Sequence, residues 1–227
     1  MSKNIKDICF IIQSRLDSKR LPKKMLTPFA GSNLFEIAIA KLVNCSFIPN
    51  ENIYLSLYDQ ELISIGEKYP VNIFKRSKES VSESKEPKIV SEWGWKLPHK
   101  WFITINACTP LLTNETIINF TKCFLNSPNK SLFAVHNKKN FYWDEKGNMI
   151  TKYPGSLDSK LVNNTFEAAH CLYAGCKKDL SNNVYLGDFT FNYPELYEVH
   201  EKETFDIDEF WQFKVAEILY KNKNKFL

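Results

Sequence analysis

The chain has 227 residues, enough to bury a sizeable core, and we expect it to form one domain over residues 1–227. With 44% hydrophobic and 25% charged residues its composition is ordinary for a globular protein, and no apolar run approaches the roughly 18 residues that a membrane span requires. The net charge of +4 is small and dispersed, so composition predicts neither a membrane nor a nucleic-acid partner.

The N-terminus and the cysteines indicate the compartment. No apolar segment precedes the first predicted strand, so we expect no signal peptide. The six cysteines show no paired CxxC spacing, and several lie in apolar runs, where a reduced thiol packs as a small hydrophobe. The predicted location is therefore the cytoplasm.

Strands and helices alternate through the first part of the chain. Short apolar runs predict strands, and apolar residues at helical spacing predict helices. This order predicts an α/β fold with a mostly parallel sheet and helices on both faces, which binds ligands beyond the carboxyl ends of its strands. The predicted strands are 8–13, 53–58, 71–74, 101–106, 131–136 and 168–174, and the predicted helices are 33–44, 60–68, 86–97, one that begins near Thr113 or Asn114, and 209–221.

The alternation breaks after the strand at 131–136. Residues 139–154 predict a hairpin in which three consecutive aromatics, Phe141, Tyr142 and Trp143, precede a polar turn. A lone hairpin is marginal unless it packs on something, and exposed aromatic surface usually marks an interface. We therefore expect this embedded arm to join two subunits as a homodimer.

The segment after the first predicted strand carries five basic residues within ten positions. It is neither a P-loop nor a GxGxxG turn. Arginine and lysine side chains with backbone amides can neutralise the roughly four negative charges of a nucleoside triphosphate, and Pro22 would stiffen the turn that positions Lys24. Charge alone leaves a solvated basic loop without a ligand as an equal alternative. The basic residues are Arg15, Lys19, Arg20, Lys23 and Lys24.

Asp206 and Asp208 lie two residues apart, so on an extended segment both carboxylates point the same way. A hard cation such as Mg²⁺ prefers such oxygen ligands. The alternative is that Asp208 caps the last helix while Asp206 is solvated. Zinc at His170, Cys171 and Cys176 is a poor alternative, because two thiols and one imidazole make an incomplete ligand set.

The order of residues in the basic loop resembles the signature R-x-x-S-(K/T)-R-(L/I)-P-x-K of the sugar-acid cytidylyltransferases. That family includes the CMP-sialic acid, CMP-pseudaminic acid, CMP-legionaminic acid and CMP-Kdo synthetases, and the spore-coat polysaccharide nucleotidyltransferases share the signature. Further similarities run along nearly the whole chain. The similar segments are Arg15 to Lys24, Phe74 to Arg76, Ile105 to Leu112, Asn140 to Trp143, His170 to Tyr173, and Phe205 to Asp208.

The resemblance implies the nucleotide-diphospho-sugar transferase (Rossmann-like) fold and a dimerisation arm. It implies that CTP and a 2-keto-3-deoxy sugar acid react to give a CMP-sugar acid and pyrophosphate. Asp206 and Asp208 would hold Mg²⁺ or Mn²⁺, and Arg15 and Lys24 would be catalytic. The residues implied to bind the nucleotide are Arg15, Ser18, Lys19, Arg20, Lys24, Arg76 and Asn106.

The sequence also departs from the family pattern. Met25 stands where sialic acid synthetases have an asparagine near the base, Leu112 replaces an arginine, and Cys108 falls where the Kdo and spore-coat groups have an acidic residue near the metal. These departures leave the particular sugar open. They also leave two alternatives: a spore-coat-like enzyme that acts on another sugar or alcohol phosphate, and a non-catalytic nucleotide-binding relative.

Overall fold

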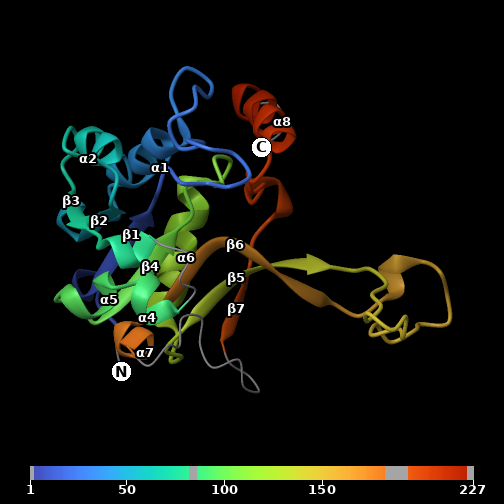
Figure 1. Ribbon diagram of the computed structural model, residues 1–227. Helices are drawn as coiled ribbons and strands as arrows, with labels where there is room; N and C mark the ends of the chain where they lie inside the picture. Colours follow the sequence, from blue (N-terminus) through green and yellow to red (C-terminus); the bar gives the residue numbers. More distant parts are fainter. Residues whose placement is uncertain (1–2, 82–85, 182–193, 224–227) are drawn as a thin grey trace.

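A seven-stranded sheet forms the centre of the computed structural model, which describes residues 3–81, 86–181 and 194–223. The strand order is β3-β2-β1-β4-β6-β5-β7, and every pairing is parallel except those that β6 makes with β4 and β5 (Figure 1). The predicted mostly parallel sheet is confirmed. The strands are β1 (Ile8–Gln13), β2 (Ile53–Leu57), β3 (Asn72–Lys75), β4 (Trp101–Ile105), β5 (Leu132–Lys138), β6 (Thr165–Cys176) and β7 (Glu195–Glu198).

Helices cover both faces of the sheet, as predicted. Helices α1, α2, α6 and α8 contribute to the larger core on one face, and α5 and α7 contribute to a smaller core on the other. None of the described helices is long and apolar enough to span a membrane. The helices are α1 (Leu34–Val43), α2 (Gln60–Gly66), α3 (Lys78–Val81), α4 (Pro87–Val90), α5 (Trp93–Lys96), α6 (Asn114–Asn126), α7 (Lys177–Ser181) and α8 (Phe210–Lys221), with 3₁₀ turns at Ile5–Asp7, Asn50–Asn52, Ser159–Leu161 and Glu201–Glu203.

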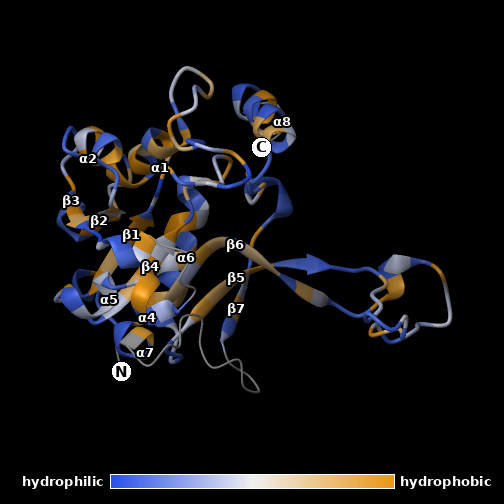
Figure 2. Ribbon diagram, viewed as in Figure 1, coloured by the Kyte–Doolittle hydropathy of each residue, from blue (hydrophilic) through white to orange (hydrophobic). Residues whose placement is uncertain are grey.

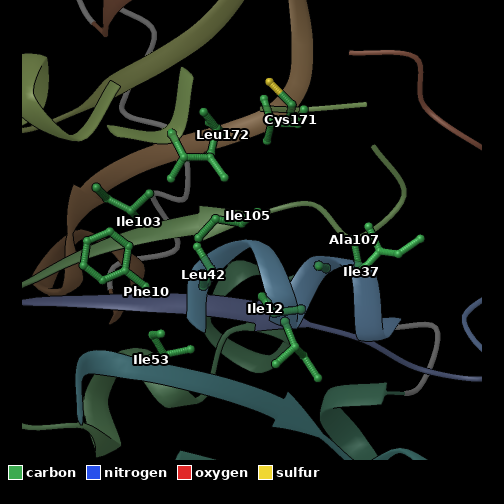
Figure 3. Packing of buried hydrophobic residues seen from close by; sticks show 14 of the residues in the cluster. Phe10, Ile12, Ile37, Leu42, Ile53, Ile103, Ile105, Ala107, Cys171 and Leu172 are labelled. Atoms are coloured by element: carbon green, nitrogen blue, oxygen red, sulfur yellow. The ribbon is translucent and has the colours of Figure 1, made fainter. Parts of the chain in front are cut away.

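Strand β1 shows how the two cores are divided. Side chains alternate along a strand, so Phe10 and Ile12 enter the larger core while Cys9 and Ile11 enter the smaller one. Figure 3 shows the larger core, where Phe10 and Ile12 lie beside Leu42 of α1. A central strand with both faces covered is apolar throughout, which is why a continuous apolar run predicts it.

Side-chain caps fix where two of the predicted helices begin. The Asn33 carboxamide oxygen accepts from the backbone N–H of Glu36 at 2.9 Å, so α1 starts one residue later than predicted. The Thr113 hydroxyl accepts from the backbone N–H of Thr116 at 3.2 Å, which makes Thr113 rather than Asn114 the cap of α6.

The predicted helix over 86–97 is wrong as one continuous element. The segment forms two single turns, α4 and α5, separated at Ser91, whose φ of −110° and ψ of 44° leave the helical region. The break lets Trp93 turn into the smaller core, where its ring meets the edge of the Phe102 ring. Tertiary packing here overrides local helical preference.

The arm is longer than predicted and its tip is less regular. Strands β5 and β6 run on as an antiparallel ribbon that projects from the body, and its outer part mixes hydrophilic and hydrophobic residues (Figures 1 and 2). Within 139–154 the expected hairpin is reduced to one isolated bridge, Trp143 with Met149, around a turn at Asp144. The turn and the antiparallel bridge lie where the hairpin was expected, but its arms form no longer strands, since paired strands need a packed face that this tip lacks.

Candidate active site

A cavity of about 430 Å³ lies beyond the carboxyl ends of β1 and β4. This is where an open α/β sheet binds its ligand, and the volume is that of an ordinary small-molecule site. Six of the seven residues expected to bind the nucleotide meet there, and Arg76 is the exception. The lining residues are Gln13, Ser14, Arg15, Ser18, Lys19, Arg20, Lys24, Met25, Asn106, Ala107, Cys108 and Asp208.

Backbone contacts hold the basic loop in place on one side of the cavity. The backbone N–H of Ser14 donates to Ser56 of β2 at 3.2 Å, and the backbone N–H of Leu16 donates to the Asp59 carboxylate at 2.9 Å. At the turn after Leu21, the backbone N–H of Lys24 donates to the Leu21 carbonyl oxygen at 3.2 Å. The predicted turn at Pro22 is thus present.

Lys23, the third residue of that turn, has a φ of 55°. A type II turn often has proline as its second residue and requires a positive φ at its third, where glycine is the favoured residue. The backbone strain at Lys23 therefore belongs to the turn that aims Lys24 into the cavity.

Arg20, Lys24 and Asp208 form what we call the charged cluster. The Lys24 ammonium donates to the Ile207 carbonyl oxygen at 2.6 Å and lies 3.3 Å from Asp208 Oδ1, and Arg20 Nη2 lies 2.7 Å from the same carboxylate oxygen. The Lys24 side chain is 11% exposed, while that of Arg20 is 63% exposed. Lys24 is the anchored cation of the cluster, and Arg20 is the exposed one.

Burial opposes the charge of Lys24, but its contacts with Cys108 and Asp208 outweigh that effect and raise the pKa of Lys24. Burial also raises the pKa of the Cys108 thiol to about 11. Cys108 is therefore a neutral thiol near pH 7, so the negative charge that faces Lys24 at this pH is that of Asp208. An incoming phosphate oxygen can take over that role.

Asp208 does not cap the last helix. Glu209 is the N-cap residue of α8, and the Gln212 side-chain oxygen accepts from the backbone N–H groups of Asp208 at 2.8 Å and Glu209 at 2.7 Å. The capping alternative for Asp208 is therefore wrong, because its carboxylate points to Lys24 and Arg20 instead.

Asp206 lies next to this carboxylate. Its Oδ1 is buried and has no hydrogen-bond partner in the described part of the chain. Burial, followed by the charge of Asp208, raises the pKa of Asp206. A cation would satisfy the unpartnered oxygen, so the two carboxylates fit Mg²⁺ as a pair, with water or phosphate oxygens as the other ligands.

The described part of the chain does not contain a complete metal site. Over residues 3–81, 86–181 and 194–223, no group of three or more His, Cys, Asp or Glu side chains is arranged to hold an ion. The carboxylate pair has only two members, and His170, Cys171 and Cys176 are not arranged as such a group. A divalent cation at the carboxylate pair would take its remaining ligands from water or from phosphate oxygens.

Arg76 follows β3 but lies outside the cavity lining. Its side chain is buried and donates to the Ser80 hydroxyl at 3.0 Å, to the Ser80 carbonyl oxygen, and to the Val90 carbonyl oxygen at 3.2 Å. Burial, followed by the charge of Arg15, lowers the pKa of Arg76 to about 10, so the guanidinium stays protonated near pH 7. Arg15 donates to Val81 of the same α3 segment at 3.1 Å.

Asn106 lines the cavity, with both ends of its side-chain amide bonded to the protein. Its nitrogen donates to the His170 carbonyl oxygen and its oxygen accepts from the Cys108 backbone N–H, each at 2.9 Å. His170 has a φ of 51°, an unusual conformation for a residue other than glycine. Asn106 therefore shapes the loop after β4 and ties it to β6.

Sequence reasoning missed Lys41, which holds the same loop from α1. Its ammonium donates to the carbonyl oxygens of Thr109 at 3.0 Å and Pro110 at 2.7 Å. Burial, with a smaller effect from Lys223, lowers the pKa of Lys41 to about 7. A signal was present, because Lys41 lies four residues after Ile37 on the apolar face of the predicted helix.

The uncharged part of the cavity consists of Gln13, Ser14, Met25 and Ala107, which we call the neutral wall. Sequence reasoning placed Met25 near the base but assigned no role to the other three. The Ser14 hydroxyl contacts the Met25 sulfur at 3.8 Å, and both residues are buried. The available signal was position, since Gln13 ends one central strand and Ala107 follows the next one along the sheet.

Comparison with known proteins gives one consistent result. A sequence model of the cytidylyltransferase family matches residues 9–215. The chain is 24% identical over 232 residues to the pseudaminic acid cytidylyltransferase of Campylobacter jejuni subsp. jejuni serotype O:2, covering 96% of this chain and 97% of that protein. Over 81 residues it is 32% identical to the spore coat polysaccharide biosynthesis protein SpsF of Bacillus subtilis, covering 33% of this chain and 34% of that protein.

The fold comparison agrees with the sequence comparison. The structure superposes with a TM-score of 0.71 on a CMP:2-keto-3-deoxy-manno-octonic acid synthetase complexed with CTP, at 12% identity and covering 95% of this chain and 99% of that one. The predicted nucleotide-diphospho-sugar transferase fold is therefore confirmed.

Proposed function

This chain belongs to the cytidylyltransferase family, and we propose that it joins CTP to a 2-keto-3-deoxy sugar acid, releasing pyrophosphate. The observation that carries the proposal is the cavity itself, whose basic loop meets the acidic segment before α8 at the carboxyl edge of the sheet. The pseudaminic acid cytidylyltransferase, which aligns over nearly the whole chain, supports a sugar acid as the acceptor.

In the proposed reaction the anomeric hydroxyl oxygen of the sugar acid attacks the α-phosphorus of CTP. A new O–P bond forms, the bond from the α-phosphorus to the bridging oxygen breaks, and pyrophosphate leaves with the electron pair while the hydroxyl proton passes to solvent. Arg15, Lys19, Arg20 and Lys24 would hold the phosphates and offset the charge that develops on the leaving group. Catalysis by these residues is mainly positioning and electrostatics.

Asn106 and Arg76 belong to the nucleoside side in this proposal. Asn106 would act through the wall that its two hydrogen bonds shape. Arg76 would act through α3, to which both it and Arg15 are bonded. Ser18 lines the cavity beside the basic residues and would bind a phosphate oxygen through its hydroxyl.

Asp206 and Asp208 would hold a divalent cation, Mg²⁺ or Mn²⁺, at the mouth of the basic loop. When bound, such an ion supplies positive charge to the phosphate oxygens around the reacting phosphorus. Asp208 would then exchange its pairing with Arg20 for the cation, and the freed guanidinium would turn to the triphosphate.

We also propose that the arm joins two copies of the chain. Three large apolar side chains of the tip are exposed, Trp143 to 55%, Ile150 to 69% and Leu157 to 85%. Exposed apolar surface on a projecting ribbon is typical of a protein interface. Light scattering at micromolar concentration should give a dimer, and the double change Trp143→Ser with Leu157→Ser should give a monomer. Trp95→Ser, an exposed tryptophan on the body, is the matched control and should stay dimeric.

Pyrophosphate release with CTP and a panel of ulosonic and nonulosonic acids tests the reaction. We expect release that needs both CTP and one of these acids. Release with a sugar phosphate or an alcohol phosphate instead would favour the spore-coat-like alternative. Tight CTP binding without any release would favour a non-catalytic nucleotide-binding relative.

A further inference from the structure

Gln13 is the last residue of β1 and lines the cavity. Alternation along the strand places its side chain on the same face as Cys9 and Ile11, the face that carries the smaller core. Trp93 of α5 belongs to that core, and its indole Nε1 donates to the Gln13 side-chain oxygen at 2.9 Å. One buried tryptophan therefore determines how the glutamine amide is oriented.

Trp93 is a rigid anchor. It is fully buried, and its ring packs edge-on against the Phe102 ring with 5.3 Å between centroids. Helix α5 also packs closely on α7, because a Cβ atom added at Gly94 would lie 2.7 Å from Leu180 Cδ1. Little room is left for the indole to shift, so the position of its N–H group is fixed.

This hydrogen bond decides which end of the amide faces the cavity. An indole nitrogen can only donate, so the atom of Gln13 that it contacts is the oxygen. The NH₂ group is then what Gln13 offers to a ligand, and the described part of the chain provides no acceptor for it. The other polar side chains nearby are engaged, since the Ser14 hydroxyl of the neutral wall contacts Met25 and the amide of Asn106, which also lines the cavity, is bonded at both ends.

We propose that Gln13 recognises the cytosine base, donating from its amide NH₂ to the ring nitrogen N3, and that Trp93 holds the amide in the orientation this requires. Cytosine N3 is a hydrogen-bond acceptor, whereas uracil N3 carries a proton. A fixed donor therefore favours CTP over UTP, because UTP would set two donors against each other and leave the half-buried amide unpaired. The inference rests on the proposed function and assigns its choice of base to two residues.

Calorimetric titration with CTP and with UTP, without any sugar acid, tests the assignment. Gln13→Glu keeps the shape of the side chain and an oxygen for Trp93, but it replaces the donor with an acceptor. The added negative charge weakens both triphosphates, so the readout is the ratio of the UTP Kd to the CTP Kd. We expect this ratio to fall by about tenfold or more.

Two further variants make the test specific. Trp93→Phe removes the N–H group and frees the amide to turn, so the ratio should fall less than in Gln13→Glu, with thermal melting confirming that the variant folds. Gln60→Glu is the same chemical change at an exposed position outside the cavity, and it should keep the wild-type ratio.

The outcomes separate this inference from the proposed function. A wild-type ratio in Gln13→Glu, with CTP still preferred, overturns the role of Gln13 and leaves the function standing. This holds also when the affinities for CTP and UTP fall by the same factor, because Gln13 would then contact an atom that the two bases share. A wild-type protein that prefers CTP but transfers it to no sugar acid, with the ratio falling in Gln13→Glu, supports the inference and contradicts the proposed acceptor.

Discussion

The charged cluster and the neutral wall share one cavity but are built from different interactions. Arg20, Lys24 and Asp208 are joined by ion pairs, and the Arg20 side chain is largely exposed. Gln13 is held by a single hydrogen bond from a fully buried tryptophan. Exposed ion pairs contribute little and can be exchanged for a phosphate, whereas a buried donor keeps its direction.

The difference suggests a division of work within the site. The charged cluster would supply affinity for any triphosphate and stabilise the leaving pyrophosphate. The neutral wall would choose the base. Each region can be altered separately, because no residue belongs to both.

Asp208→Asn should have the largest effect on the charged cluster. It keeps the shape of the side chain but removes the charge that would hold a divalent cation and that pairs with Lys24. Turnover should fall by about 100-fold or more at limiting Mg²⁺, because charge stabilisation at the transferring phosphate is lost. The measurement is a rate profile across a Mg²⁺ titration, and near-wild-type rates at limiting metal would end the metal assignment.

Lys24→Met should have the next largest effect. Removing a largely buried cation that would contact phosphate should lower kcat/KM for CTP by about 10- to 100-fold, as expected for hydrogen bonds to charged groups. Lys23→Met is the matched control, because Lys23 points away to Glu61 with both side chains exposed. Equal losses in the two variants would show that general positive charge, rather than the anchored position of Lys24, matters.

Lys41→Met tests the loop that connects the two regions. The folded pKa of about 7 lies below the ordinary value of 10.5, so between these values the unfolded chain binds a proton that the folded chain does not. Stability from this group therefore rises with pH above 7 and is reduced below it. From pH 6 to pH 9 the melting temperature of the wild type should rise relative to that of Lys41→Met. The expected rise is about 2–4 °C for each kcal/mol gained in the free energy of unfolding. Parallel curves would mean that Lys41 titrates normally.

Lys23→Gly should have the smallest effect. Glycine adopts the φ of 55° without the cost of about 1 kcal/mol that a side chain brings, although it loses more backbone entropy on folding. Unfolding in urea should show a variant as stable as the wild type or more stable by up to about 1 kcal/mol, with CTP affinity unchanged. Clear destabilisation would show that the Lys23 side chain, rather than the turn geometry, supports the loop.

The local sequence pattern predicted the charged cluster better than the neutral wall. The basic loop and Asp208 were recognisable because charges cluster in sequence and follow a known motif. Gln13 was not, since its role depends on Trp93, which lies 80 residues away and turns inward only because the predicted helix over 86–97 breaks at Ser91.

The fold shows the same contrast. The apolar strands and the capped helices were predicted to within a few residues, because periodicity and capping are local. The arm was placed correctly in the chain but not in detail. Its ribbon is formed by Lys138 pairing with Thr165, a long-range contact that no pattern within 139–154 contains.

The most direct test of the division of work is the salt dependence of nucleotide binding. Calorimetric Kd values for CTP and UTP would be measured on the wild-type protein from low to high KCl at fixed Mg²⁺. Screening of the charged cluster should weaken the binding of both nucleotides in parallel, while the preference for CTP, which would be set by an uncharged and partly buried donor, stays constant. A preference that disappears as salt rises would contradict the account, because selection of the base would then depend on the charged cluster.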